Sequence, residues 1–350
     1  MRERIAARAA RRLATWHFTI HLPAPTMSIR HHRLAQSALL IVATLSATSL
    51  HAQPAAANAK SLLPGPKPAA VAVLKKSVGE YDSAGKVLFV IEDSARLVLV
   101  DTTTGSASRR AMTRASIASL HLTKRVVGPA EGSNQLKVKP VRSIDDIRRE
   151  ALAASPPAEK PAAKAADLVE LTKLDRTIKL EIRYATTNNF AGTVFYDQPR
   201  AFMQRPAAEA VVRAHRALRT LGYGLLIHDA YRPWYVTKMF WDAMPEDKHW
   251  LVANPAEGSK HNRGAAVDLT LYDVKSGQPI EMPSTYDEST GRAHADYPGG
   301  TSLQRWHRAL LRNAMVTEGF IVNSLEWWHF DFGSWRDYAI GNVTFDKIGK

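Results

Sequence analysis

A serine, a histidine, a glycine and an aspartate occur at short intervals in SKHNRGAAVDLTLYD, residues 259–273. They form the pattern Ser-x-His-x-x-Gly-x-Ala-x-Asp, in which Asp268 lies inside an apolar run typical of a strand. Burying an ionised aspartate costs several kcal/mol unless a partner compensates its charge. A bound cation is one candidate partner, because a turn at Gly264 would let His261 approach Asp268 from the preceding loop.

Two other motifs extend this set of polar residues. The segment EWWHF contains Glu326 and His329, and DAYRP contains Arg232 directly after an apolar run. Since the chain has no cysteine, any metal must be bound by His, Asp or Glu side chains. His261, Asp268 and His329 supply two imidazoles and one carboxylate, which leaves the fourth tetrahedral position of a single Zn²⁺ for water.

Glu326 is the candidate base for that water. Zinc lowers the pKa of a bound water so that it becomes a nucleophile near neutral pH, and Glu326 is close to His329 in sequence. Positions 326 and 329 nevertheless point to opposite faces of an ideal strand. The prediction therefore requires a bulge, a bend or a strand end near Glu326.

The elements expected to position these residues lie between 168 and 350. Residues 205–222 and 302–319 have helical periodicity and end at Gly222 and Gly319, as helices commonly do. Residues 223–231 and 320–332 are rich in strand-forming side chains. Because these patterns alternate without a regular βαβ repeat or a Gly-rich phosphate loop, they predict an α+β domain with a small, mainly antiparallel sheet flanked by helices.

A second, smaller module is expected before this domain. Residues 70–150 contain short β-rich runs separated by Asp-Ser and Thr-Gly turns, which predicts a mostly β accessory module closed by a short helix at 143–154. Linkers rich in Ala and Pro flank it at 53–69 and 151–167. The domain that carries the chemistry then spans residues 168–350.

Residues 1–52 are expected to be a leader. From Met27, where we expect translation to start, Arg30 and Arg33 precede a short apolar stretch, and SLHA precedes Gln53. This order is typical of a cleaved secretory signal at 27–52. Its apolar core is shorter than the ~20 residues of a spanning helix, so we expect a periplasmic protein without a stable membrane span.

The charge is unevenly distributed along the chain. The net charge is +14, but residues 168–350 contain 22 basic and 21 acidic side chains, so the excess lies before them. A nucleic-acid-binding protein would be expected to carry its positive charge on the functional domain. We therefore expect no nucleic-acid partner, and at most weak contact of the basic front half with anionic wall or membrane surfaces.

The motifs together resemble a known family. EIRYATTNNFAG (181–192), DAYRP, SKHNRGAAVDLTL and EWWHFDF are similar, in this order, to motifs of D-alanyl-D-alanine dipeptidases of the vancomycin-resistance type. These enzymes belong to the lysostaphin/D-Ala-D-Ala metallopeptidase superfamily. The resemblance covers most of 168–350 and none of the front module. It implies zinc-dependent hydrolysis of the D-Ala-D-Ala dipeptide in the turnover of cell-wall peptides.

The resemblance also implies a role for each site residue. His261, Asp268 and His329 would bind zinc, and Glu326 would act as general base and later protonate the leaving amine. Arg232 would stabilise the oxyanion, which is often a large part of catalysis. The remaining three residues would bind substrate: Ser259 by a hydrogen bond, Asp287 by pairing with the free ammonium group, and Tyr184 by lining the pocket.

Other interpretations of the same residues remain open. Arg232 could pair with Asp229 beneath the pocket, Ser259 could be a turn residue, and Asp287 could belong to an ordinary polar loop. A D,D-carboxypeptidase, a peptidoglycan endopeptidase and a non-catalytic wall-binding zinc module are alternatives for the whole protein. The best-known relatives in vancomycin resistance act in the cytosol, so the predicted leader favours turnover of wall-derived dipeptide instead.

Overall fold

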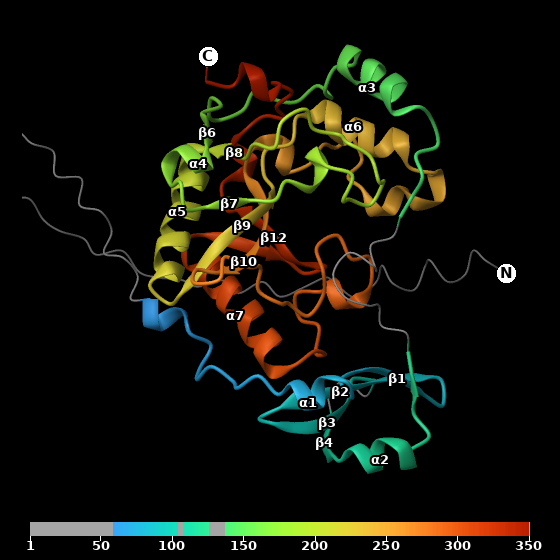
Figure 1. Ribbon diagram of the computed structural model, residues 1–350. Coiled ribbons are helices and arrows are strands. Elements are labelled where there is room, and N and C mark those ends of the chain that lie inside the picture. The colour runs from blue at the N-terminus through green and yellow to red at the C-terminus, as the bar shows by residue number, and fades with distance from the viewer. Residues whose placement is uncertain (1–58, 104–107, 126–136, 350) are drawn as a thin grey trace, which may run out of the picture. The chain divides into compact units, whose positions relative to one another are not determined.

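The computed structural model describes residues 59–103, 108–125 and 137–349 (Figure 1). All described residues belong to one compact unit. The predicted leader and its signal segment at 27–52 lie outside the described residues. Within the described part of the chain, no helix has both the length and the apolar character needed to cross a membrane.

The first sheet is formed by the front part of the chain. It consists of β1 (Gly79–Ser83), β2 (Lys86–Asp93), β3 (Arg96–Asp101), β4 (Ser108–Met112) and β5 (Thr123–Lys124), with short helices α1 (Ala72–Lys75) and α2 (Arg114–Ser119). Its strands pair antiparallel in the order β4-β3-β2-β1-β5. A small core of Tyr81, Val90, Leu97 and Met112 stabilises it. The expectation of a mostly β front module is confirmed.

The second sheet has the order β11-β12-β10-β9-β7. Its strands are β7 (Lys179–Leu180), β9 (Tyr223–Asp229), β10 (Ala266–Asp273), β11 (Phe320–Asn323) and β12 (Glu326–Phe332). All neighbours are antiparallel except β7 and β9, which are parallel. A smaller antiparallel pair is formed by β6 (Leu168–Glu170) and β8 (Phe202–Gln204).

Helices α5 (Arg205–Arg219) and α7 (Ser302–Thr317) pack against the second sheet. A proline occupies the first turn of α5, and the side chain of Thr301 caps the N-terminus of α7. Gly222 and Gly319 follow the two helices with φ of 87° and 88°, a left-handed conformation that glycine adopts without steric cost. The two predicted helices and the α+β class are thus confirmed.

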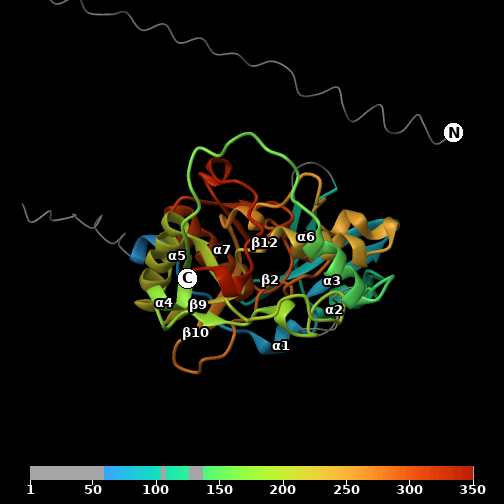
Figure 2. The same cartoon turned by 90° about the horizontal axis from the view of Figure 1, so that it is seen from above.

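Two further helices lie on the other side of the sheet from α5. They are α3 (Ile144–Ala153) and α6 (Trp234–Ala243), which pack together, while the short α4 (Leu171–Leu174) lies near α5 (Figures 1 and 2). Ile147 and Ala151 of α3 are fully buried in the larger core. The helix that we expected to close the front module therefore packs on α6 instead. The predicted domain bounds themselves stay predictions.

One predicted strand is a hairpin in the structure. Residues 320–332 form β11 and β12, which pair antiparallel across a turn at Ser324 and Leu325. Sequence composition does not show the break, because both halves are rich in aromatic and β-branched residues. The hairpin places β12 between β11 and β10, so the side chains of β12 lie beside those of β10 on each face of the sheet.

Candidate metal centre and substrate pocket

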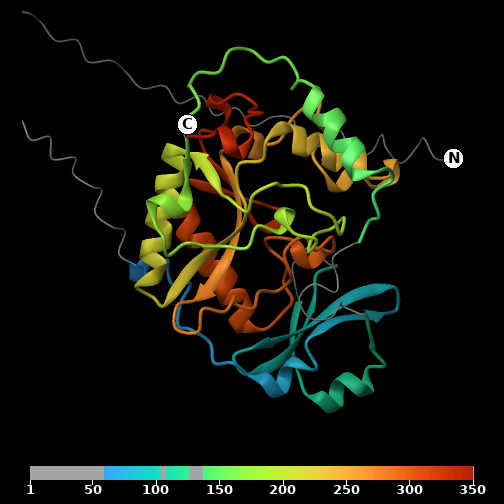
Figure 3. The ribbon, with the colours of Figure 1, turned by 45° about the horizontal axis from the view of Figure 1, so that its top comes forward.

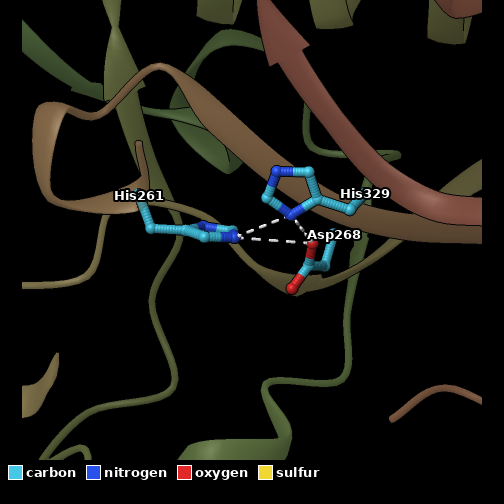
Figure 4. A group of neighbouring side chains, drawn as sticks. All are labelled: His261, Asp268 and His329. Carbon is cyan, nitrogen blue, oxygen red and sulfur yellow. Dashed lines mark hydrogen bonds and ion pairs between the residues drawn. The ribbon is translucent and has the colours of Figure 1, made fainter. Parts of the chain in front are cut away.

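The pairing of β10 with β12 brings two of the predicted ligands together. Asp268 and His329 are directly opposite each other in the antiparallel register, and such pairs place their side chains on the same face, about 5 Å apart. Nδ1 of His329 lies 2.9 Å from Oδ1 of Asp268 (Figure 4). Val267 and Leu269, which alternate with Asp268, point instead into the apolar core.

The third predicted ligand comes from the turn before β10. His261 begins a short 3-10 helix that ends at Gly264, whose φ is 64°. This confirms the predicted turn, and a Cβ atom at Gly264 would lie 2.5 Å from Leu168 Cδ2. Nε2 of His261 lies 3.2 Å from His329 Nδ1 and 3.5 Å from Asp268 Oδ1. One atom from each of the three residues lies within 4.8 Å of the others, so this group could hold a metal ion.

Hydrogen bonds on the far side of each imidazole orient it toward the group. Nδ1–H of His261 donates to the carbonyl oxygen of Ala230 at 2.7 Å, and Nε2–H of His329 donates to Oδ1 of Asp331 at 2.9 Å. Each histidine can therefore turn a free nitrogen toward Asp268. Outer hydrogen bonds of this kind are a regular feature of metal-binding histidines, so the donor set fits a cation.

The electrostatics of the metal-free protein agree with this assignment. Burial would lower the pKa of His329, but its hydrogen bonds to Asp268 and Asp331 raise it to about 10. Burial would raise the pKa of Asp268, but His261 and His329 lower it. A proton on His329 thus compensates the buried carboxylate, and a metal ion would take over that role.

Glu326 faces the same site because β12 is irregular. Val322 is opposite Phe330, but the next residue, Asn323, is opposite Glu326. This register shift supplies the irregularity that the sequence analysis required. Oε2 of Glu326 lies 3.8 Å from His329 Nδ1 and accepts a hydrogen bond from Asn323 Nδ2 at 3.0 Å. Burial, opposed by His329, raises the pKa of Glu326, which favours proton acceptance near neutral pH.

Arg232 is held in a fixed orientation below the site. Its Nε and Nη2 donate to Oδ2 of Asp229 at 3.0 and 2.6 Å, and its guanidinium lies over the rings of Tyr184 and Phe240. The ion pair between Arg232 and Asp229, which the sequence analysis gave as an alternative role for Arg232, is therefore present. These two bonds use Nε and Nη2 of the guanidinium and a single carboxylate oxygen of Asp229. The backbone N–H of Arg232 also donates to the carbonyl oxygen of His261 at 3.1 Å, so Arg232 contacts the loop formed by residues 259–264.

Asp287 lies in the segment that joins β10 to α7, beside Tyr184 and Tyr286. The hydroxyl of Tyr184 donates to its carboxylate at 3.1 Å, and the hydroxyl of Tyr286 donates to Oδ2 of Asp268 at 3.0 Å. Burial and the negative charges of Asp268 and Glu326 raise the pKa of Asp287 to about 8. A cationic group beside Asp287 would restore its ionised form.

The backbone at Asp287 is strained, with φ of 58°. A non-glycine residue in this conformation persists only where its surroundings fix it, and such residues cluster at functional sites. Four other described non-glycine residues, Ala84, Ser94, Ala95 and His121, also have positive φ, so it is the contacts of the Asp287 carboxylate that favour a specific role over that of an ordinary loop residue.

Ser259 supports the loop that carries His261, residues 259–264. Its Oγ accepts a hydrogen bond from the backbone N–H of His261 at 3.2 Å, and its own N–H donates to Oδ1 of Asn262 at 2.7 Å. The turn role is thus visible, and the predicted hydrogen bond to substrate stays a prediction. His228 is buried and stacks on Tyr286 with ring centroids 4.5 Å apart.

Sequence analysis missed two side chains that contact the ligands directly, Asp331 and Tyr286. Asp331 could have been found, because it is two residues after His329 and alternate residues of a strand share a face. Tyr286 gave no comparable signal, since it lies in an irregular segment far from Asp268 in sequence.

Comparisons with known proteins agree with this geometry. A family model described as "D-ala-D-ala dipeptidase" matches residues 164–344. The D-alanyl-D-alanine dipeptidase of Escherichia coli is 33% identical over 174 residues, which are 50% of this chain and 89% of that protein. The D-alanyl-D-alanine dipeptidase of Enterococcus faecium is 32% identical over 194 residues, covering 50% of this chain and 95% of that protein. The chain belongs to the D-Ala-D-Ala dipeptidase family and is a metallopeptidase.

Proposed function

We propose that the protein is a zinc-dependent dipeptidase that hydrolyses D-Ala-D-Ala derived from the cell wall. The observation that carries this proposal is the convergence of His261, Asp268 and His329, with Glu326 beside them. Two imidazoles and a carboxylate with one open position are the donor set of catalytic zinc sites. The substrate is inferred from the names of the relatives.

Different residues of the chain have different roles in the proposed reaction. When bound, zinc would supply Lewis-acid polarisation of the scissile carbonyl and a lowered pKa for water. Glu326 accepts the proton of the attacking water and later delivers it to the leaving amine. Arg232, fixed by Asp229, offers its guanidinium group to the oxygen on which negative charge develops. Removing such a donor from comparable sites typically lowers the rate by about 10²–10³.

Asp287 favours a dipeptidase over a carboxypeptidase or an endopeptidase. A free dipeptide has an ammonium group beside the scissile bond, whereas a longer peptide has a neutral amide there. An acid at that end of the pocket pairs with the ammonium group of a free dipeptide, whereas a longer peptide leaves the acid without a cation. Tyr184, which donates to Asp287, would hold the carboxylate in place. Ser259 would contribute a hydrogen bond from the loop formed by residues 259–264.

The deciding experiment compares free D-Ala-D-Ala with a wall peptide that ends in the same pair. We expect the free dipeptide to have the higher kcat/KM, and faster cleavage of the longer peptide would make the enzyme a carboxypeptidase. Metal analysis of the purified protein should give about one zinc per chain. Bound zinc without turnover of either substrate would favour the non-catalytic wall-binding module.

We further propose that the protein acts in the periplasm. The support is the signal-like sequence at residues 27–52, and the basic excess before residue 168 would allow weak contact with anionic wall or membrane surfaces. Fractionation of cells that express the full chain tests this proposal. We expect a shortened protein in the periplasmic fraction, and an uncleaved protein in the cytosol would contradict it.

A further inference from the structure

The segment that joins β10 to α7, residues 274–301, contacts the candidate site and the N-terminal sheet. Tyr286 and Asp287 are on its site side, and Tyr297 is on its sheet side. Figure 3 shows the sheet beside this segment. The family match begins at residue 164, so strands β1 to β5 lie outside the part shared with the family. Their contacts with the segment therefore concern a feature particular to this chain.

Glu92, near the end of β2, contacts the N-terminus of α7. It is only 1% exposed, and Oε2 accepts hydrogen bonds from the backbone N–H and the hydroxyl of Ser302 at 2.8 and 2.6 Å. Oε1 accepts from the N–H of Ala95 at 2.8 Å. A carboxylate at a helix N-terminus is stabilised by the unpaired N–H groups and the helix dipole. This buried charge therefore fixes the sheet to the point where the segment ends.

Tyr297 forms a second contact inside the segment. It is 5% exposed, its hydroxyl donates to Oε1 of Glu80 at 3.1 Å, and its ring packs edge-on against Phe89 with centroids 5.6 Å apart. Both partners belong to the N-terminal sheet. A hydrogen bond to a carboxylate together with an aromatic pair specifies position more tightly than apolar burial alone.

The segment is also connected to the strands of the site, through Ser284 before Asp287 and through Ala295 after it. The N–H of Ala295 donates to the carbonyl of Ser324 in the β11–β12 turn at 3.0 Å. Oγ of Ser284 accepts from Nε1 of Trp327, next to Glu326, at 2.8 Å. The strained φ of Asp287 requires that its surroundings fix the backbone. The sheet contacts are part of those surroundings, since they hold the end of the segment that follows Asp287.

We propose that the N-terminal sheet positions the segment so that Asp287 closes the ammonium end of the substrate pocket. Glu92 and Tyr297 are the positioning residues, and neither touches substrate. The sheet then contributes to selectivity for free dipeptides without contributing to metal binding. This inference rests on the proposed function, since the ammonium contact of Asp287 belongs to it.

The test uses full-length, metal-loaded protein and the variants Glu92→Ala and Tyr297→Phe. Asp101→Asn is the matched control, because Asp101 belongs to the same sheet and its carboxylate accepts hydrogen bonds from Thr103 at the end of β3. The substrates are D-Ala-D-Ala and its N-acetylated form, which lacks the ammonium group. We expect Glu92→Ala to raise KM for the free dipeptide about tenfold, the equivalent of one charge-assisted hydrogen bond. The values of kcat, metal content and KM for the N-acetylated form should stay within about twofold of wild type.

Hydrogen exchange of residues 283–297 gives a readout that needs no substrate. We expect faster exchange in Glu92→Ala and, to a smaller extent, in Tyr297→Phe, with Asp101→Asn unchanged. Unchanged exchange in both variants overturns the proposal, and so does an equal loss of activity on both substrates. A wild-type enzyme inert toward the dipeptide would refute the proposed function alone, because the exchange measurement would still decide whether the sheet fixes the segment.

Discussion

Asp331→Asn should weaken metal binding although Asp331 is not itself a predicted ligand. Its Oδ1 accepts the Nε2–H of His329 at 2.9 Å, on the side of the ring away from Asp268. Asp331 is 5% exposed and pairs with Lys260. The negative charge of Asp331 makes the imidazole a better donor to a cation, and the hydrogen bond fixes the ring's direction.

The magnitude follows from what asparagine keeps and what it loses. The amide oxygen can still accept from His329, so the ring orientation is largely kept, but the charge is removed. Loss of an outer-shell partner typically lowers metal affinity by about 10–100-fold, which corresponds to about 1.4–2.7 kcal/mol. Lys260→Met is the matched control. The side chain of Lys260 is 41% exposed, and exposed ion pairs contribute about 0–1 kcal/mol, so a smaller change is expected.

Competition titration measures the effect directly. Metal-free wild type and both variants are titrated with zinc against a chromophoric chelator, and far-UV circular dichroism checks that each variant is folded. The reasoning is refuted if Asp331→Asn binds zinc within about twofold of wild type, well below the 10–100-fold expected for an outer-shell partner. A larger loss in Lys260→Met than in Asp331→Asn would refute it too, because the ion pair and not the imidazole contact would then control affinity.

Four other changes test the site and the fold. Glu326→Gln should lower kcat by about 10²–10⁴ with zinc content unchanged; retained turnover would exclude Glu326 as the base. Asp287→Asn should raise KM for free D-Ala-D-Ala about tenfold, and an equal change for the N-acetylated dipeptide would contradict the ammonium contact. Burial lowers the pKa values of His215 and His307 from 6.5 to about 4. As pH falls from 6.5 to 4, the histidines of the unfolded chain are protonated before those of the folded protein. The free energy of unfolding should therefore fall by roughly 2–3 kcal/mol for each histidine in that window. Urea unfolding at pH 6.5 and pH 4 measures this decrease, and equal midpoints would refute it. Gly264→Ala should destabilise the protein by about 1–3 kcal/mol because of its positive φ, whereas an unchanged Tm would show that the turn tolerates a side chain.

The approach of His261 to Asp268 could be predicted because short-range rules determine it, whereas His329 joins them only through the pairing of β12 with β10. The spacing of Ser259, His261, Gly264 and Asp268 specifies a turn followed by a strand, and the structure contains both. The alternation of Asp268 with Val267 and Leu269 then places the acid on the opposite face from the core. Local chemistry is enough for these residues.

The position of Glu326 could not be predicted from such rules. It depends on a register shift in the pairing of β12 with β11, and register is a property of two strands and their connection. The break between the two strands was itself missed. The contact of Glu92 with Ser302 could not be predicted either, because the two residues are far apart in sequence and belong to different modules.

The surroundings of the site also explain why an acid, Asp268, lies inside the apolar strand β10. Asp268 is one of several carboxylates there, and they outnumber the fixed cations. Burial, together with the negative charge of neighbouring carboxylates, raises the pKa values of Asp287 and Glu326, so these two groups reduce the excess by holding protons. Binding a divalent cation and a substrate ammonium would release those protons and leave the carboxylates ionised. The excess of carboxylates would therefore favour binding of both cations. The acids are Asp229, Asp268, Asp287, Glu326 and Asp331, and the fixed cations are Arg232 and Lys260.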